Sequence, residues 1–168
     1  MNVPFRKLLS AKIHRATVTQ ANVHYEGSIT IPPELLAAAG IHTYESVWVW
    51  NVTRGTRLET YAITGQPNSS DICANGAAAH LIRPGDKVII ASFAFVPETE
   101  LDSHRPRLVF VDDANAISHL GPEVPGPAIR DEHQPATAPS VKVPARGKPM
   151  EKPIITADPS GESTGANR

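Results

Sequence analysis

The sequence has a single cysteine, few aromatic residues and no long apolar run. Cys73 is the only cysteine among 168 residues, so no internal disulfide can form, which suits a reducing compartment such as the cytoplasm. A lone cysteine in an apolar context is more often a small core residue than a nucleophile. No segment approaches the roughly 18 continuous apolar residues of a membrane span, so we expect no membrane association.

Neither sign of charge is in excess. The chain carries 16 Lys and Arg against 17 Asp and Glu, for a formal net charge of −1. Without a basic field to attract phosphates, nucleic acid is not an expected partner. Basic residues precede the first acid, Glu26, but no apolar core or cleavage signal follows them. We therefore expect a basic strand of the folded domain there, and not a targeting peptide.

The last part of the chain lacks aromatic residues altogether. From Pro122 to Arg168 it holds nine of the 16 prolines and no Phe, Trp or Tyr. Such a segment lacks the side chains whose burial repays the entropy of ordering. The sequence predicts one folded domain over residues 1–121 and a Pro-rich disordered tail over 122–168. A solvated extension is favoured over a partner-binding arm.

Within the predicted domain, the periodicity is mostly that of strands. Strand patterns cover residues 8–19, 22–31, 46–53, 56–64, 87–95 and 107–112. A turn at Arg54-Gly55 should join the third and fourth of these as a hairpin. One short helix is indicated, opened by Pro32-Pro33 and ended by Gly40. Short strands with regularly spaced turns predict a mainly β fold, a small barrel with short helices.

The most informative stretch is Tyr25-Glu26-Gly27-Ser28. In a strained turn, the serine hydroxyl lies beside the preceding carbonyl, and glycine puts no side chain in the way of an attack on it. Taken alone, a Gly-Ser pair is in most proteins an ordinary turn. Its significance depends on the motifs around it.

Those motifs occur on both sides of the Gly-Ser pair. They are Lys12-Ile13-His14-Arg15, Ala16-Thr17-Val18-Thr19, Trp50-Asn51-Val52-Thr53, Thr60-Tyr61-Ala62-Ile63 and Asn75-Gly76-Ala77-Ala78-Ala79-His80. In this order and at these separations, the series resembles the pyruvoyl-dependent aspartate 1-decarboxylase family. The resemblance runs from about residue 6 to about residue 115.

The resemblance implies a fold, an activity and an assembly. The fold would be a six-stranded double-psi β-barrel. The activity would be the α-decarboxylation of L-aspartate to β-alanine and CO2, which supplies pantothenate and coenzyme A biosynthesis. The family also implies a homotetramer with active sites between neighbouring subunits. Whether a separate maturation factor takes part is left open.

The family resemblance also implies that the cofactor is made from the chain itself. The Ser28 hydroxyl would attack the Gly27 carbonyl, and the resulting ester would eliminate to leave a dehydroalanine that hydrolyses to a covalent pyruvoyl group. This group would form a Schiff base with the substrate amine and accept electrons as CO2 leaves. No metal is required, and the seven histidines show no metal-site spacing.

The family pattern assigns roles to two residues of the hairpin. Thr60 would assist self-cleavage by hydrogen-bonding the attacked carbonyl and would later face the substrate. Tyr61 would donate a proton to the carbanion left by decarboxylation. The alternative for Tyr61 is a tyrosine at the edge of the core whose hydroxyl is satisfied elsewhere.

The loop that begins at Asn75 has the composition of a site that binds through backbone amides. Small side chains let a ligand approach N–H groups. The resemblance assigns Asn75 to support of the cleavage intermediate and Gly76, Ala77 and Ala78 to substrate contact. A close-packed turn that starts a helix is an equal alternative from sequence alone.

Cations are expected to hold the carboxylates of a dicarboxylic substrate. Arg57 and Lys12 are the candidates, although solvated surface charges are their alternative reading. Arg57 precedes Thr60 by three residues on one predicted strand, which puts the two side chains on opposite faces unless a bulge intervenes. His14 and His24 flank the site in sequence and are expected to be structural, with a role in orienting the turn as the alternative.

Two other functions fit the same residues. One is a sibling decarboxylase acting on another small amino acid. The other is a non-catalytic barrel that serves as a binding module and is never cleaved at Ser28.

Overall fold

The computed structural model describes residues 3–124, and these belong to one structural unit. Residues 1–2 and 125–168 lie outside the described part. The predicted tail over 122–168 therefore falls almost entirely outside the described residues, and its predicted disorder stays a prediction.

The described residues form nine strands, one α-helix and two 3₁₀ helices. In chain order they are β1 (Phe5–Thr17), β2 (Gln20–Asn22), β3 (Ser28–Ile31), α1 (Pro33–Ala39), β4 (Ser46–Asn51), β5 (Arg57–Thr64), β6 (Cys73–Asn75), η1 (Gly76–His80), β7 (Lys87–Pro97), η2 (Glu98–Glu100), β8 (Arg107–Val111) and β9 (Ile117–Leu120). The fold is mainly β, as the sequence predicts.

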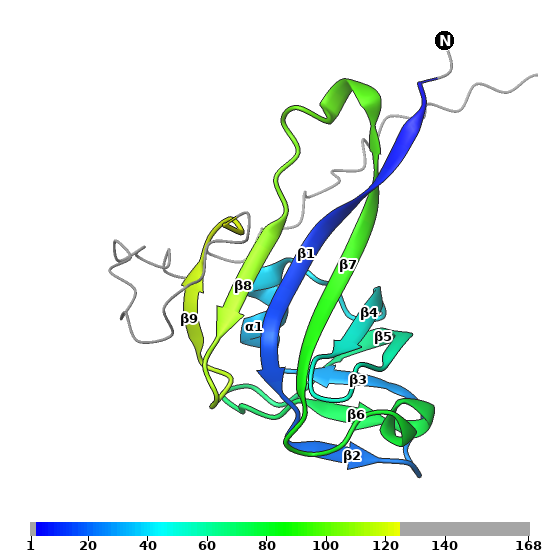
Figure 1. Ribbon diagram of the computed structural model, residues 1–168, viewed down its shortest axis with the longest axis vertical. Helices are drawn as coiled ribbons and strands as arrows, with labels where there is room; N and C mark the ends of the chain where they lie inside the picture. The colour runs from blue at the N-terminus through cyan, green and yellow to red at the C-terminus, as the bar shows by residue number, and fades with distance from the viewer. Residues whose placement is uncertain (1–2, 125–168) are drawn as a thin grey trace, which may run out of the picture. The chain divides into compact units, whose positions relative to one another are not determined.

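All nine strands pair in the order β2-β6-β3-β5-β4-β7-β1-β8-β9. Figure 1 shows β1 and β7 as two long strands that run side by side, with β8 next to β1. The pairs β1–β8, β2–β6 and β3–β5 are parallel, and the other pairs are antiparallel. Parallel pairing brings together strands that are far apart in the sequence.

The hairpin and the helix are confirmed. β4 and β5 are antiparallel, with Trp50 opposite Arg57 and Ser46 opposite Tyr61. Helix α1 has Pro32 at its N-cap and ends at Gly40, whose φ of 70° is the left-handed conformation that glycine adopts without a Cβ penalty. The strands predicted over 8–19, 87–95 and 107–112 correspond to β1, β7 and β8.

Two details of the predicted fold are wrong. The strand count is nine and not six, because β2, β6 and β9 have only three or four residues, too few for a recognisable alternation. The single strand predicted over 22–31 is broken by a turn before β3, in which the Gly27 amide donates to the Tyr25 carbonyl at 2.9 Å. Within residues 3–124, β2 and β9 are the two ends of the strand order and do not pair with each other. The strand pairing of these residues therefore does not show a closed barrel.

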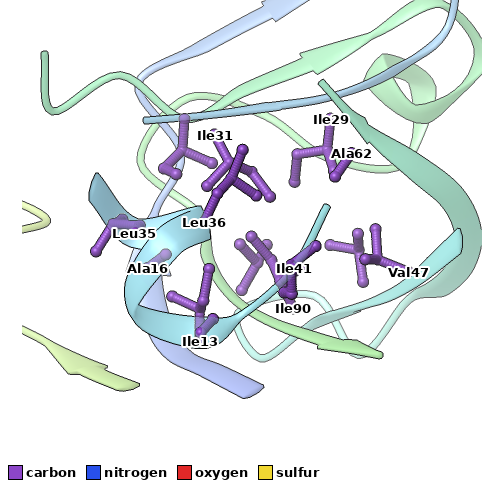
Figure 2. Packing of buried hydrophobic residues seen from close by; sticks show 14 of the residues in the cluster. Ile13, Ala16, Ile29, Ile31, Leu35, Leu36, Ile41, Val47, Ala62 and Ile90 are labelled. Atoms are coloured by element: carbon purple, nitrogen blue, oxygen red, sulfur yellow. The ribbon is translucent and has the colours of Figure 1, made fainter. Parts of the chain in front are cut away.

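The hydrophobic core fixes the strand that carries the Gly-Ser motif. Figure 2 shows Ile29 and Ile31 of β3 packed with residues of α1, β1 and β7, among them Leu36 and Ile90. Both isoleucines have no exposed surface, and full burial of such a side chain contributes about 1.5 to 3 kcal/mol. Because side chains alternate along a strand, Ser28 and Thr30 lie on the other face of β3.

Candidate active site

Ser28 is the first residue of β3 and is held in a strained backbone. It is 2% exposed and has a φ of 102°, which is unusual for a residue with a Cβ. A strained backbone of this kind typically costs about 1 to 3 kcal/mol and persists only where neighbouring structure enforces it. The strain lies on the C-terminal side of the Gly27-Ser28 peptide bond.

Gly76 enforces this geometry from the neighbouring loop. A Cβ built on Gly76 would lie 2.6 Å from the nitrogen and 2.7 Å from the Cα of Gly27, and 2.9 Å from the Tyr25 carbonyl oxygen. Only glycine permits this approach, and Gly27 itself has a φ of 45°. The turn that contains the Gly-Ser bond therefore packs against Gly76, the first residue of η1.

Asn75 contacts the Ser28 hydroxyl directly. The antiparallel register of β3 and β6 places Ser28 opposite Asn75. The Asn75 amide nitrogen Nδ2 donates to Ser28 Oγ at 3.2 Å and to Thr30 Oγ1 at 2.9 Å. Asn75 is 3% exposed, so these bonds are made out of contact with bulk water. The predicted link between Asn75 and the Gly-Ser bond thus has a geometric basis.

A small depression opens on this bond from one side. Its volume is about 180 Å³, and its lining comprises Gly27, Ser28, Leu58, Glu59, Thr60, Asn75, Ala77, Ala78 and Leu81. Thr60 therefore shares a surface with Ser28 and with the small residues of η1. The 3₁₀ helix over Gly76–His80 also agrees with the alternative reading of a turn that starts a helix.

Tyr61 lines a second depression beside the same bond. This depression of about 280 Å³ has a lining of Tyr25, Glu26, Gly27, Ser28, Thr43, Tyr44, Tyr61, Ile63 and Thr64. A Cβ built on Gly27 would lie 4.0 Å from the Tyr61 hydroxyl. Tyr61 is 39% exposed, and the centre of its ring is 6.4 Å from that of Tyr44. Its hydroxyl therefore lies near the Gly27-Ser28 bond in an accessible position.

Arg57 is not brought to Ser28 within this chain. The β4–β5 register has no bulge, so Arg57 and Thr60 lie on opposite faces of β5. The Arg57 guanidinium instead lies 6.0 Å from the centre of the Trp50 ring. It borders a depression lined by Lys7, Trp48, Trp50, Arg57 and Phe93.

Lys12 is also separate from Ser28. It is 5% exposed on β1, and its amine pairs with the carboxylate of Glu123. Burial lowers the pKa of Lys12 from its ordinary value. Within residues 3–124, the linings of the two depressions beside Ser28 contain no Lys or Arg.

The two flanking histidines have different surroundings. The backbone amide of His24 donates to the side chain of Asn22 in the exposed turn before Ser28. The ring of His14 lies on β1, 5.2 Å from the ring of Phe110. Neither residue lines the depressions beside Ser28.

Sequence reasoning missed two contacts of the site. The Cys73 thiol donates to the Asn75 carbonyl oxygen Oδ1 at 3.1 Å, and Thr30 accepts from the same amide. Cys73 is half-buried, and burial followed by the charge of Asp71 raises the pKa of its thiol. The alternation of side chains along β3 and β6 could have placed Thr30 with Ser28 and Cys73 with Asn75. However, β6 is too short to be recognised as a strand from the sequence.

A larger depression of the described chain lies elsewhere. It has a volume of about 670 Å³ beside β8, and its lining includes Arg105, Arg107 and Leu120. None of the residues assigned from the sequence motifs lines it. The geometry around Ser28, and not cavity size, therefore identifies the candidate site.

Neither a metal cluster nor a membrane helix is found in the described part of the chain. Residues 3–124 contain no group of three or more His, Cys, Asp or Glu side chains arranged to hold a metal ion. The helices within these residues are too short or too polar to cross a bilayer.

Comparisons with known proteins give matches that agree with one another. A family model described as aspartate decarboxylase matches residues 4–118. An aspartate 1-decarboxylase of Rhodopirellula baltica is 68% identical over 132 residues, covering 79% of this chain and 85% of that protein. One from Legionella pneumophila strain Lens is 61% identical over 119 residues, covering 71% and 90%. One from Myxococcus xanthus is 56% identical over 126 residues, covering 74% and 97%.

Proposed function

Since the chain belongs to the aspartate decarboxylase family, we propose that it is a self-cleaving proenzyme that decarboxylates L-aspartate to β-alanine and CO2. It would act in the cytoplasm and supply pantothenate and coenzyme A biosynthesis. The family match over residues 4–118 supports a single decarboxylase domain that ends near residue 121. The parallel pairs β1–β8, β2–β6 and β3–β5 are compatible with a double-psi topology for that domain.

The observation that carries the proposal is the state of Ser28. A buried serine with a φ of 102° follows a glycine whose backbone is wedged against Gly76, and its hydroxyl accepts a hydrogen bond from Asn75. Cleavage of the Gly27-Ser28 bond would release this backbone strain, which favours the reaction. Ordinary turns have no need of such a close glycine contact.

The cleavage chemistry balances with atoms of the chain and one water. Ser28 Oγ bonds to the Gly27 carbonyl carbon, the C–N bond breaks, and the hydroxyl proton passes to the Ser28 nitrogen, which gives an ester and a free amine. Loss of the Ser28 α-proton then breaks the Cβ–Oγ bond, and the electron pair leaves on Oγ as part of the Gly27 carboxylate. The remaining dehydroalanine takes up water and loses ammonia.

The surroundings of Ser28 suit the pyruvoyl group that these steps would produce. The group needs space without bulky side chains, and Ala77 and Ala78 line the depression beside Ser28 together with Thr60. When present, a pyruvoyl group supplies an electron sink for the decarboxylation of an amino acid. Thr60 would first hydrogen-bond the attacked carbonyl and later face the substrate, and Gly76, Ala77 and Ala78 would contact it.

Tyr61 is proposed as the proton donor. Its hydroxyl lies near Gly27 in the depression whose lining does not include Asn75, and this depression is open to solvent. A phenol held close to the reacting carbon can deliver a proton to the position that loses the carboxylate. Tyr44, which lies beside it in the same depression, would form part of the wall.

We further propose that a neighbouring subunit of a homotetramer supplies the cations for the substrate carboxylates. The linings beside Ser28 lack Lys and Arg within residues 3–124, and a dicarboxylic substrate needs such a partner. Arg57 and Lys12 of that neighbouring subunit are the residues proposed to supply these cations. The exposed ring of Phe95 and the aromatic depression beside Arg57 are surfaces that an assembly would cover.

Intact mass spectrometry tests the proposal most directly. Purified and incubated protein should resolve into residues 1–27 and 28–168, with a pyruvoyl group at the start of the second fragment. Ser28→Ala should remain one chain. If the wild-type chain stayed whole after prolonged incubation with host extract, the protein would be an unprocessed barrel. Assays of the cleaved protein with aspartate and with other small amino acids would identify a sibling decarboxylase.

A further inference from the structure

Four side chains form a compact group on one face of β3 and β6. The antiparallel register places Ser28 opposite Asn75 and Thr30 opposite Cys73. Since alternate residues of a strand share a face, all four side chains project to the same side. The two isoleucines of β3 occupy the opposite face in the core.

The Asn75 amide lies at the centre of this group. Its Oδ1 accepts from the Cys73 thiol at 3.1 Å, and its Nδ2 donates to Ser28 Oγ at 3.2 Å and to Thr30 Oγ1 at 2.9 Å. A rotation of the amide by 180° would exchange its oxygen and nitrogen. The hydroxyls of Ser28 and Thr30 tolerate either orientation, because a hydroxyl both donates and accepts.

The thiol does not tolerate both orientations equally. Sulfur is a weak acceptor, so a Cys73 thiol that faces Nδ2 would leave a buried N–H poorly satisfied. A thiol that faces Oδ1 can donate its proton, and the raised pKa of Cys73 keeps that proton in place at neutral pH. Leaving a buried polar atom without a partner is costly, so the thiol favours the orientation in which Nδ2 faces Ser28.

We propose that Cys73 is a positioning residue for self-cleavage, which orients the Asn75 amide so that an N–H points at Ser28 Oγ, while Thr30 holds the second N–H. This inference rests on the proposed cleavage at Ser28. The orientation of the Asn75 amide matters most when the Cβ–Oγ bond of Ser28 breaks. Oγ then carries the departing electron pair, and an N–H donor stabilises that negative charge. With the amide reversed, Oδ1 would face that developing charge.

The test measures the cleavage rate of freshly purified, uncleaved protein. Cys73→Ala removes the donor and should slow cleavage by about 10-fold, the scale of one lost hydrogen bond. Cys73→Ser keeps a donor at the same place and should cleave within about 2-fold of wild type. Thr30→Val should slow cleavage, and Thr30→Ser should restore it.

Ser10→Ala is the matched control, because it removes a hydrogen bond between Ser10 and Ser92 that lies away from the site. It should cleave at the wild-type rate. The inference is overturned if Cys73→Ala cleaves as fast as wild type, or if Cys73→Ser is as slow as Cys73→Ala. The second result would show that the sulfur matters for packing and not for its proton.

A separate measurement distinguishes this inference from the proposed function. If the wild-type chain never cleaves, the proposed function fails. The orientation of the Asn75 side-chain amide can still be followed in ¹⁵N-edited spectra, through the chemical shifts of its two amide protons. We expect the two amide protons to shift in Cys73→Ala and to keep nearly wild-type positions in Cys73→Ser. Unchanged signals in Cys73→Ala would overturn the inference in that case too.

Discussion

Gly76 packs directly against the backbone of Gly27, so that a Cβ on Gly76 would lie 2.6 Å from the Gly27 nitrogen. Two residues 49 positions apart along the chain are thus in close backbone contact. The contact holds the peptide bond before Ser28 in a turn whose next residue has a φ of 102°. The loop that follows β6 is therefore part of the machinery that strains the Gly-Ser bond.

Gly76→Ala should block maturation. The added methyl group meets backbone atoms that cannot rotate away, so the turn at Gly27 must move, and a displacement of about 1 Å typically costs a reaction roughly 100-fold in rate. The rate is measured by following the intact mass of the chain. Gly55→Ala is the control, since Gly55 also has a positive φ, 73°, but a Cβ there meets nothing within 4 Å. Equal cleavage by the two variants would contradict the role of the Gly76 contact.

Tyr61→Phe should separate maturation from turnover. The ring still fills its place while the phenolic proton is lost, so cleavage at Ser28 should proceed and β-alanine release should fall by roughly 100-fold or more. Turnover is measured on fully cleaved protein. The matched control is Tyr44→Phe, which changes the neighbouring ring of the same depression and should retain activity. Wild-type turnover by Tyr61→Phe would assign the proton to another group.

Mixed oligomers should reveal whether Arg57 acts on a neighbouring subunit. Ser28→Ala cannot mature, and Arg57→Ala should require far more aspartate because it loses carboxylate binding. Co-expressed, the two variants would form some sites with Ser28 from one chain and Arg57 from the other. We expect these mixtures to regain aspartate turnover at low substrate concentration. The control is a mixture of the two variants that are purified separately and then combined. If the co-expressed variants were no more active than this mixture, Arg57 would lie outside the site.

Asp86 should make the fold sensitive to acid. Burial by itself raises the pKa of this carboxyl, but hydrogen bonds from the Arg83 amide, Asn51 and Arg54, together with the Arg54 charge, outweigh it and lower the pKa. Asp86 Oδ2 accepts at 2.9 Å, 2.7 Å and 2.8 Å from these groups. A lowered folded-state pKa contributes stability that is present above the unfolded value of about 3.9 and is lost as pH falls through the folded value.

Asp86→Asn should therefore lose about 2 kcal/mol of unfolding free energy at pH 7, the scale of broken buried hydrogen bonds to a charged group. Urea unfolding of the Ser28→Ala background, which stays one chain, provides the measurement. The difference in unfolding free energy between the chains with and without the Asp86→Asn substitution should narrow below about pH 4. Glu98→Gln, which breaks an exposed pair with Arg6, should cost less than about 1 kcal/mol. If this difference in unfolding free energy stayed constant across pH, the negative charge of Asp86 would not be what stabilises the fold.

Local chemistry was readable from the sequence where it depended on residues close together. The prolines before α1 and Gly40 after it determined the helix, and alternation determined the β4–β5 hairpin. The motif around Ser28 and the spacing of its companions pointed to the family, which the comparisons confirm. These signals are strong because a helix end, a hairpin and a Gly-Ser turn are each set by neighbours within a few residues.

Tertiary structure alone decided which distant groups meet. The three-residue strand β6 carries no periodic signal, yet its register with β3 places Asn75 against Ser28 and Cys73 against Thr30. Nothing in the sequence showed that Gly76 would pack on Gly27. The spacing of Arg57 and Thr60 predicted opposite faces unless a bulge intervened, and only the structure shows that β5 has no bulge. Contacts across paired strands depend on register, and register is set by the packing of the whole sheet on its core, not by the residues that make the contact.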